Sequence, residues 1–108
     1  MSNSKYAGHI STLKGEALNY WMYRHAAKEL SRDASDAEFE KGYAAGQYQF
    51  ATDKALVVDL MLRYNVRLQM IGSEWLASTE KGGQFGESPN EAACRLVIAQ
   101  AFGVEPSL

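Results

Sequence analysis

Residues 66–79 read VRLQMI-GS-EWLAST, two short segments on either side of the dipeptide Gly72-Ser73. Glycine in the first central position of a two-residue loop is typical of a type II′ hairpin turn. Such a loop places Ile71 opposite Glu74, and the following pairs put mainly apolar residues on one face: Met70 with Trp75, Leu68 with Ala77, and Val66 with Thr79. The segment therefore predicts an antiparallel hairpin whose apolar face packs on helices.

Helices are predicted on both sides of this hairpin. Four segments carry helix signals, either apolar side chains at helical spacing or capping residues. They lie at about residues 12–30, 36–45, 53–64 and 89–102. Ser35 and Ser88 each begin a capping box, and Thr12 and Thr52 are the expected caps of the first and third helices.

The remaining segments complete an α+β interpretation. Residues 47–51 alternate polar and apolar and predict a brief strand, whereas the glycine-rich residues 80–87 predict a flexible connector. We expect helices at both ends and a central helix, packed on a β-hairpin or a small three-stranded antiparallel sheet. Residues 1–11 are expected to form a flexible leader, and residues 12–108 a single domain.

Composition argues against several classes of partner. The chain of 108 residues has a formal net charge of −2, which provides no general attraction to nucleic acid or anionic membranes. Residues 1–10 lack the apolar core of a signal peptide, and no apolar run is long enough to span a bilayer. We therefore expect a cytoplasmic protein with neither a membrane nor a nucleic acid as partner, and without a cofactor.

The chain has few histidines and cysteines, two residue types common at catalytic and metal sites. The two histidines, His9 and His25, have no metal-binding spacing, and the single cysteine, Cys94, lies among apolar residues. A catalytic histidine or cysteine needs a partner group within reach, and no motif supplies one. We predict no catalytic residue and no metal site.

A few exposed side chains are candidates for binding. Arg63 and Arg67 lie close to Asn65 and could grip an anion, although Arg63 could instead pair with Asp59. Phe85 is predicted to be an exposed contact residue. Glu87 precedes the last helix, where its negative charge opposes a phosphate.

Three stretches resemble a family of small bacteriophage and prophage proteins typified by the NinX protein. They are residues 12–21 (TLKGEALNYW), residues 86–95 (GESPNEAACR) with the later Phe102-Gly103-Val104, and residues 51–53 (ATD). The last resembles the S-T-D of a central family motif, which normally continues with a tryptophan and a glycine pair. Lys54 and residues 55–59 (ALVVD) stand there instead. The resemblance implies a phage or prophage origin and no particular activity, and it makes Thr52 and Asp53 candidate binding residues.

Two classes of function follow. The first is a non-enzymatic phage accessory protein that binds a host protein, such as a defence component, in the bacterial cytoplasm. The alternative is a small-ligand or nucleotide-binding protein, such as a sponge for a signalling nucleotide. A hydrolase whose acid–base pair is not apparent in the sequence is a third option. The candidate partner- or ligand-binding residues are Thr52, Asp53, Arg63, Arg67, Phe85 and Glu87.

A homodimer is also predicted. The helices at residues 53–64 and 89–102 are each apolar on more than one side. A domain of this size has one small core to receive them. A two-fold contact would bury the remaining apolar surface.

Overall fold

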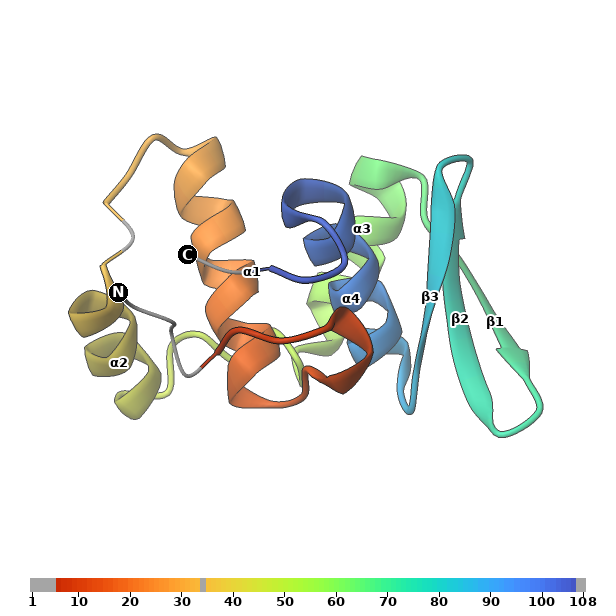
Figure 1. Ribbon diagram of the computed structural model, residues 1–108, viewed down its shortest axis with the longest axis horizontal. Helices are drawn as coiled ribbons and strands as arrows, with labels where there is room; N and C mark the ends of the chain where they lie inside the picture. Colours follow the sequence, from red (N-terminus) through yellow and green to blue (C-terminus); the bar gives the residue numbers. More distant parts are fainter. Residues whose placement is uncertain (1–5, 34, 107–108) are drawn as a thin grey trace.

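The computed structural model describes residues 6–33 and 35–106. Along the chain they form a 3₁₀ helix η1 (Ile10–Thr12), α1 (Glu16–Glu29), α2 (Asp36–Ala44), α3 (Lys54–Tyr64), β1 (Arg67–Ile71), β2 (Glu74–Thr79), β3 (Gly82–Gly86) and α4 (Pro89–Phe102). Figure 1 shows α4 between α1 and the sheet, with α2 at the opposite end of the molecule. The predicted α+β fold with a three-stranded antiparallel sheet is confirmed.

The hairpin has the predicted register. Ile71 lies opposite Glu74, and Leu68 lies opposite Ala77. Gly72 has φ +66°, as the first central residue of a type II′ turn requires, and Ser73 does not share this left-handed conformation. The turn chemistry and the apolar alternation agree, so the strands have a single favoured register.

The packed face of the hairpin is shorter than predicted. Ala77 is completely buried against the helices, and Leu68 and Trp75 are partly buried. Met70, expected on the same packed face, is 55% exposed. The hairpin extends beyond the end of α4, so its tip has no helix to cover it (Figure 1).

The third strand lies in a segment that was predicted to be a connector. Gly82–Gly86 forms β3 and pairs with β2 from Thr79↔Gly82 to Trp75↔Gly86. The predicted strand at residues 47–51 is wrong, because its backbone forms turns: the amides of Thr52 and Asp53 both donate to the Gln49 carbonyl. The second edge of β2 is therefore hydrogen-bonded by the glycine-rich strand β3 and not by residues 47–51.

The described part of the predicted leader belongs to the fold. Tyr6 and Ile10 are buried in the core, at 4% and 0% exposed. The Trp21 indole Nε1 donates to the Tyr6 carbonyl over 2.9 Å, and the Ile10 amide donates to the Val104 carbonyl over 2.6 Å. A leader is therefore wrong for residues 6–11, whereas residues 1–5 lie outside the described chain.

Two helices begin later than predicted. The hydroxyl of Thr12 donates to the His9 carbonyl within η1 instead of capping α1, which starts at Glu16. The cap of α3 is Asp53, whose Oδ1 accepts from the Ala55 amide over 3.0 Å, rather than Thr52. Asn65 ends α3 with φ +59°, the left-handed stop that the sequence predicts.

Two buried asparagines hold the turn before α3. The Asn19 side-chain oxygen accepts from the Ala51 amide over 2.7 Å. Asn90 Nδ2 donates to the carbonyls of Phe50, at 3.0 Å, and Asp53, at 2.7 Å. These bonds attach the turn that leads into α3 to both α1 and α4.

Candidate functional site

The six binding residues predicted from the sequence lie in separate parts of the molecule. Thr52 and Asp53 lie at the start of α3, and the others lie on α3, β1 and β3 and just before α4. Within residues 6–33 and 35–106, no hydrogen bond or ion pair joins any two of the six. The structure therefore does not assemble them into one site.

Two of those six side chains form ion pairs, and two others lie on the sheet. Arg63 pairs with Asp59 at 3.5 Å, the alternative that the sequence left open. Glu87 pairs with Lys14 at 3.0 Å, and this hydrogen bond lowers the pKa of the Glu87 carboxyl. Arg67 lies on β1 opposite Ser78. Phe85 is 45% exposed on the sheet.

A pocket of about 250 Å³ lies between α1 and α3 and contains one of the six, Arg63. We call it the α1–α3 pocket. Its apolar lining comes from both helices and from the turn before α3, namely Met22, Ala26, Leu30, Phe50, Leu56 and Leu60. Its polar lining is His25, Glu29, Asp59, Arg63 and Tyr64. An apolar hollow with a few convergent polar groups is the usual form of a small-molecule site.

Three of the polar residues form a hydrogen-bonded group, the His25 cluster, consisting of His25, Glu29 and Tyr64. The Tyr64 hydroxyl donates to Glu29 Oε1 over 2.5 Å. His25 Nε2 lies 2.9 Å from both the Tyr64 hydroxyl and Glu29 Oε1. The cluster connects the last two turns of α1 with the end of α3.

Burial and mutual hydrogen bonds set the protonation states of the three groups in the cluster. Burial and the hydrogen bond to Glu29 raise the pKa of Tyr64 to about 12, so its hydroxyl stays protonated. Burial lowers the pKa of His25, against the opposing effect of the Glu29 carboxylate. The hydrogen bond from Tyr64 lowers the pKa of Glu29. Near neutral pH the cluster is thus a neutral imidazole, a phenol and a carboxylate.

We expect the stability of the protein to fall as the pH drops from about 7 to about 5, and His25 to cause part of that loss. A histidine whose pKa is lowered by folding binds fewer protons folded than unfolded, so protonation below its ordinary pKa of 6.5 favours the unfolded chain. His25→Gln should therefore show a smaller loss of Tm over this range than the wild type, with Tm followed by circular dichroism. His9→Gln, at an exposed position, is the control. An unchanged pH dependence in His25→Gln would contradict the prediction.

The sequence reveals only half of this cluster. His25 and Glu29 are spaced i,i+4 on α1, a pattern that indicates a shared face. Tyr64 lies 39 residues further along the chain than His25, and nothing local in the sequence relates the two. Only the packing of α3 against α1 and α4 brings the hydroxyl to the imidazole.

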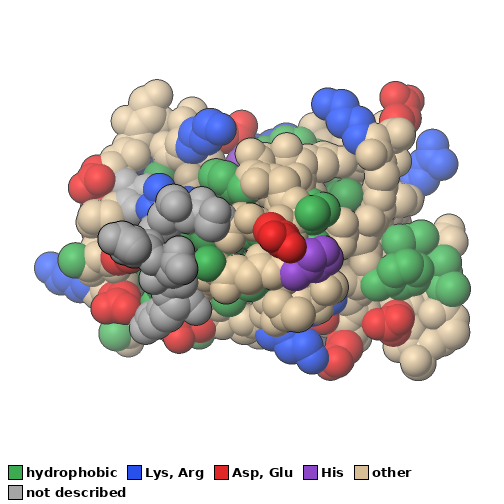
Figure 2. Space-filling model, viewed as in Figure 1, with side chains coloured by type: hydrophobic (Ala, Val, Ile, Leu, Met, Phe, Trp, Pro, Cys, Tyr) green, Lys and Arg blue, Asp and Glu red, His purple; other side chains and the backbone are tan. Residues whose placement is uncertain are grey.

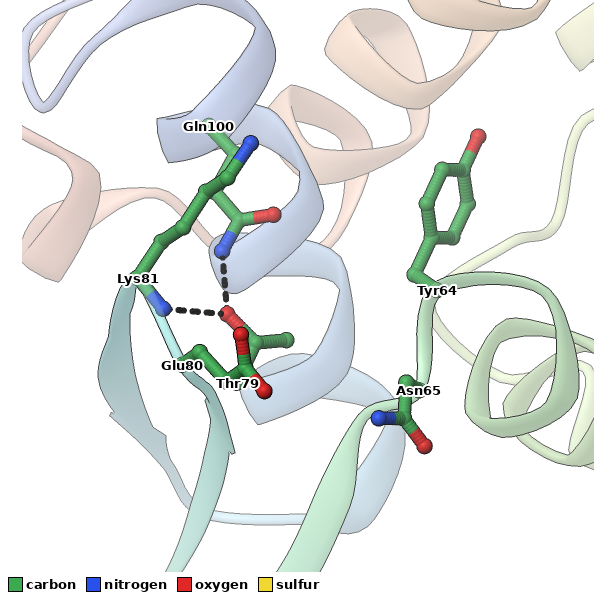
Figure 3. Close-up of a pocket in the computed structure, with 6 residues that line it drawn as sticks. All are labelled: Tyr64, Asn65, Thr79, Glu80, Lys81 and Gln100. Carbon is green, nitrogen blue, oxygen red and sulfur yellow. Dashed lines mark hydrogen bonds between the residues drawn. The ribbon is translucent and has the colours of Figure 1, made fainter.

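A second hollow lies on the other side of Tyr64 and is drawn in Figure 3. It is also about 250 Å³ and is lined by Tyr64, Asn65, Thr79, Glu80, Lys81 and Gln100. The Thr79 hydroxyl accepts from Gln100 Nε2 at 2.7 Å and from the Lys81 amide at 3.1 Å. Tyr64 borders both hollows, but its hydroxyl points away from Thr79, Lys81 and Gln100 (Figure 3) and bonds within the His25 cluster instead.

The side of α3 away from the core is apolar and exposed. Val58, Met61 and Leu62 are spaced i, i+3, i+4 and are 57%, 37% and 82% exposed. We call these three residues the α3 outer face. A hollow of about 490 Å³ lies at the start of α3 and is lined by Ala51, Thr52, Lys54, Val57, Ser88, Pro89 and Asn90. We call it the Pro89 hollow.

The sheet has a second apolar surface on the side away from α4. Leu76 lies opposite Phe85 on β3 and diagonal to Ile71 on β1. Ile71 and Phe85 are 44% and 45% exposed. Figure 2 shows hydrophobic side chains gathered over the hairpin, at the right of the view.

Cys94 lies inside the core and not in any of these hollows. The residue is 0% exposed, and burial raises the pKa of its thiol to about 12, so the reactive thiolate is disfavoured. Among the described residues, no three His, Cys, Asp or Glu side chains gather as a metal site would require. None of the described helices is both long and apolar enough to cross a membrane.

The comparisons with known proteins provide no relative. No protein-family model, curated protein or solved structure matches this chain. The function therefore has to be inferred from the surfaces and pockets of the chain itself.

Proposed function

We propose that this protein acts by binding another protein through the α3 outer face and the Pro89 hollow, without a catalytic step of its own. The observation that supports this most directly is Leu62, which is 82% exposed on a regular helix beside two further exposed apolar side chains. Burying apolar surface contributes roughly 25 cal/mol per Å², so a partner that covers this face gains affinity. Small monomeric proteins rarely leave a large contiguous apolar patch in water.

The Pro89 hollow supplies the shape that such a partner would fit. Its apolar walls, Ala51, Val57 and Pro89, can receive an aliphatic or aromatic anchor side chain. Lys54, which is exposed, lies at its edge and could pair with an acidic group next to that anchor. Of the six residues predicted from the sequence, Thr52 lines this hollow.

The partner that we propose is a host protein in the bacterial cytoplasm. This rests on the resemblance of residues 12–21, 51–53 and 86–95 to small phage and prophage proteins. A phage accessory protein acts inside the host cell, so one of the host's own proteins, such as a defence component, is the natural target. The homodimer predicted from the sequence would use the same α3 outer face and is the competing occupant.

Leu62→Asp should abolish partner binding while leaving the fold intact. A carboxylate buried in an apolar interface without a partner is costly, and an 82% exposed side chain contributes little to the folded core. We expect capture of a host protein to fall by at least about tenfold, with the Tm changed by only a few degrees. The measurement is affinity capture from phage-host lysate, followed by a binding titration with the purified captured protein.

Ile71→Asp is the matched control, because it places the same charge on the other exposed apolar surface, the outer side of the sheet. It should leave binding unchanged. Loss of binding in Ile71→Asp but not in Leu62→Asp would assign the partner to the sheet instead. Light scattering on the same proteins identifies a self-contact: a wild-type dimer that Leu62→Asp dissociates would make a second copy the occupant.

A further inference from the structure

We propose that the α1–α3 pocket binds a small organic cation, an ammonium group on an apolar body about the size of one ring. This site is separate from the protein-binding surface proposed above, because none of the three residues of the α3 outer face lines it. The inference therefore stands or falls independently of that proposal.

The size and walls of the pocket suit a compact apolar body. The volume of about 250 Å³ exceeds the roughly 150 Å³ of a cavity that accommodates benzene. Met22 and Leu60, which are 3% and 4% exposed, line it together with Phe50 and Leu56. The apolar lining gives a single ring a surface to pack against.

The charges that line the pocket are net negative. Glu29 on α1 and Asp59 on α3 supply two carboxylates, against the single guanidinium of Arg63. Arg63 is already paired with Asp59 at 3.5 Å. Because burial lowers the pKa of His25, the imidazole adds no positive charge near neutral pH. One net negative charge beside an apolar hollow favours a cation and repels the phosphates of a nucleotide.

One carboxylate oxygen is in a position to receive the ammonium group. Glu29 Oε1 is occupied by Tyr64 and His25, whereas Oε2 accepts no hydrogen bond from any residue of the described chain. The Tyr64 hydroxyl holds this carboxylate in place and lowers its pKa. The rings of Tyr64 and Phe50 also line the pocket and can face a cation. An ammonium bound there would have a charged acceptor and aromatic neighbours.

Three probes of matched size and different charge test the proposal: benzylamine, benzyl alcohol and benzoate. In calorimetric titrations of the full chain near neutral pH, benzylamine should bind saturably with a Kd of about 1 mM or tighter. Benzyl alcohol should bind more weakly and benzoate not measurably. No saturable benzylamine binding up to about 10 mM, or binding of benzoate or ATP at least as tight as that of benzylamine, would overturn the proposal.

Charge-removing variants locate the site. Glu29→Gln and Asp59→Asn should each weaken benzylamine binding, by roughly tenfold for Glu29→Gln. Glu38→Gln makes the same change on α2, outside the pocket, and should leave the affinity unchanged. Circular dichroism checks folding. If Glu29→Gln does not fold, Asp59→Asn decides alone, because the Asp59 side chain is 53% exposed. Wild-type affinity in a folded pocket variant would overturn the proposal.

Discussion

Replacing Arg95 by methionine is expected to lower the free energy of unfolding by about 3–5 kcal/mol. The Arg95 residue is only 5% exposed, and its guanidinium joins three elements. Nε and Nη2 donate to the Leu13 carbonyl after η1, at 3.2 and 3.1 Å, and Nη1 donates to the Phe85 carbonyl of β3 at 2.7 Å. Nη2 also pairs with Glu91 at 3.2 Å.

Methionine keeps much of the apolar stem of Arg95. The decrease in the free energy of unfolding therefore reports the lost polar contacts rather than a cavity. The variant would leave the Leu13 and Phe85 carbonyls without these donors and the largely buried Glu91 without its cation. Each of these groups would stay buried without its hydrogen-bonding partner, and such an unpaired buried group strongly destabilises the folded state. Urea unfolding followed by circular dichroism measures the change.

Arg63→Met is the matched control. Arg63 pairs with Asp59 at the same i,i+4 spacing, but both side chains are more than half exposed. Exposed pairs of this kind contribute about 0.3–0.5 kcal/mol. Equal decreases in the free energy of unfolding for Arg95→Met and Arg63→Met would contradict the role of burial. The double variant Glu91→Gln/Arg95→Met should be more stable than Arg95→Met, because it removes the unpaired buried charge.

The role of Arg95 shows where sequence periodicity stops being informative. Glu91 and Arg95 form the polar stripe of an otherwise apolar helix, and such a stripe normally faces solvent. Here α4 lies between α1, α3 and the sheet, so its polar stripe also faces protein (Figure 1). The spacing of Glu91 and Arg95 reveals the polar stripe. It does not reveal that the stripe is buried, because the carbonyls that accept from Arg95 lie 82 and 10 residues away along the chain.

Local signals predicted the elements that have local causes. The turn at Gly72, the cap at Ser35 and the stop at Asn65 each depend on one residue's conformation or side chain, and all three occur as predicted. The helix start expected at Thr12 was wrong, because residues 10–12 form η1 and α1 begins only after Gly15, which makes no side-chain cap. The cap expected at Thr52 was wrong by one residue, because the side chain of the neighbouring Asp53 caps α3 instead.

The candidate sites depended even more on tertiary structure. The sequence placed binding residues at Arg63 and Thr52, and each lines a hollow, but not the same one. The His25 cluster needs Tyr64, which is distant in the sequence. The helix α3 is apolar on almost every side, so only the tertiary structure determines which of its side chains, Val58, Met61 and Leu62, stay exposed. Periodicity predicted surplus apolar surface on both α3 and α4. In the structure α4 buries most of its own, and α3 does not.

Replacing Gly86 by alanine is expected to destabilise the protein by about 2–3 kcal/mol, the usual cost of overpacking against atoms that cannot move aside. A Cβ at this position would lie 2.5 Å from the Ala92 amide nitrogen and 2.9 Å from the Ala92 Cα. Both atoms belong to the backbone of α4, so no rotamer change relieves the clash. Only Glu87 and Ser88 separate Gly86 from Pro89, the first residue of α4, so strand and helix have little freedom to move apart.

Gly83→Ala, on the opposite side of the same strand, is the control for a general effect of alanine in β3. Its Cβ would lie 3.1 Å from Leu76 Cδ1 and 3.1 Å from the Ala77 carbonyl oxygen. The Leu76 side chain can rotate away, and the contact with the Ala77 oxygen is longer than the 2.5 Å contact in Gly86→Ala, so a shift of a few tenths of an ångström relieves it. We therefore expect Gly83→Ala to lower the free energy of unfolding by about 1 kcal/mol or less. Urea unfolding of both variants provides the comparison. If Gly86→Ala lowered the free energy of unfolding by less than Gly83→Ala, β3 would not pack closely against α4. Residues 82–86 would then be better described as a flexible connector than as a strand whose glycines allow close packing.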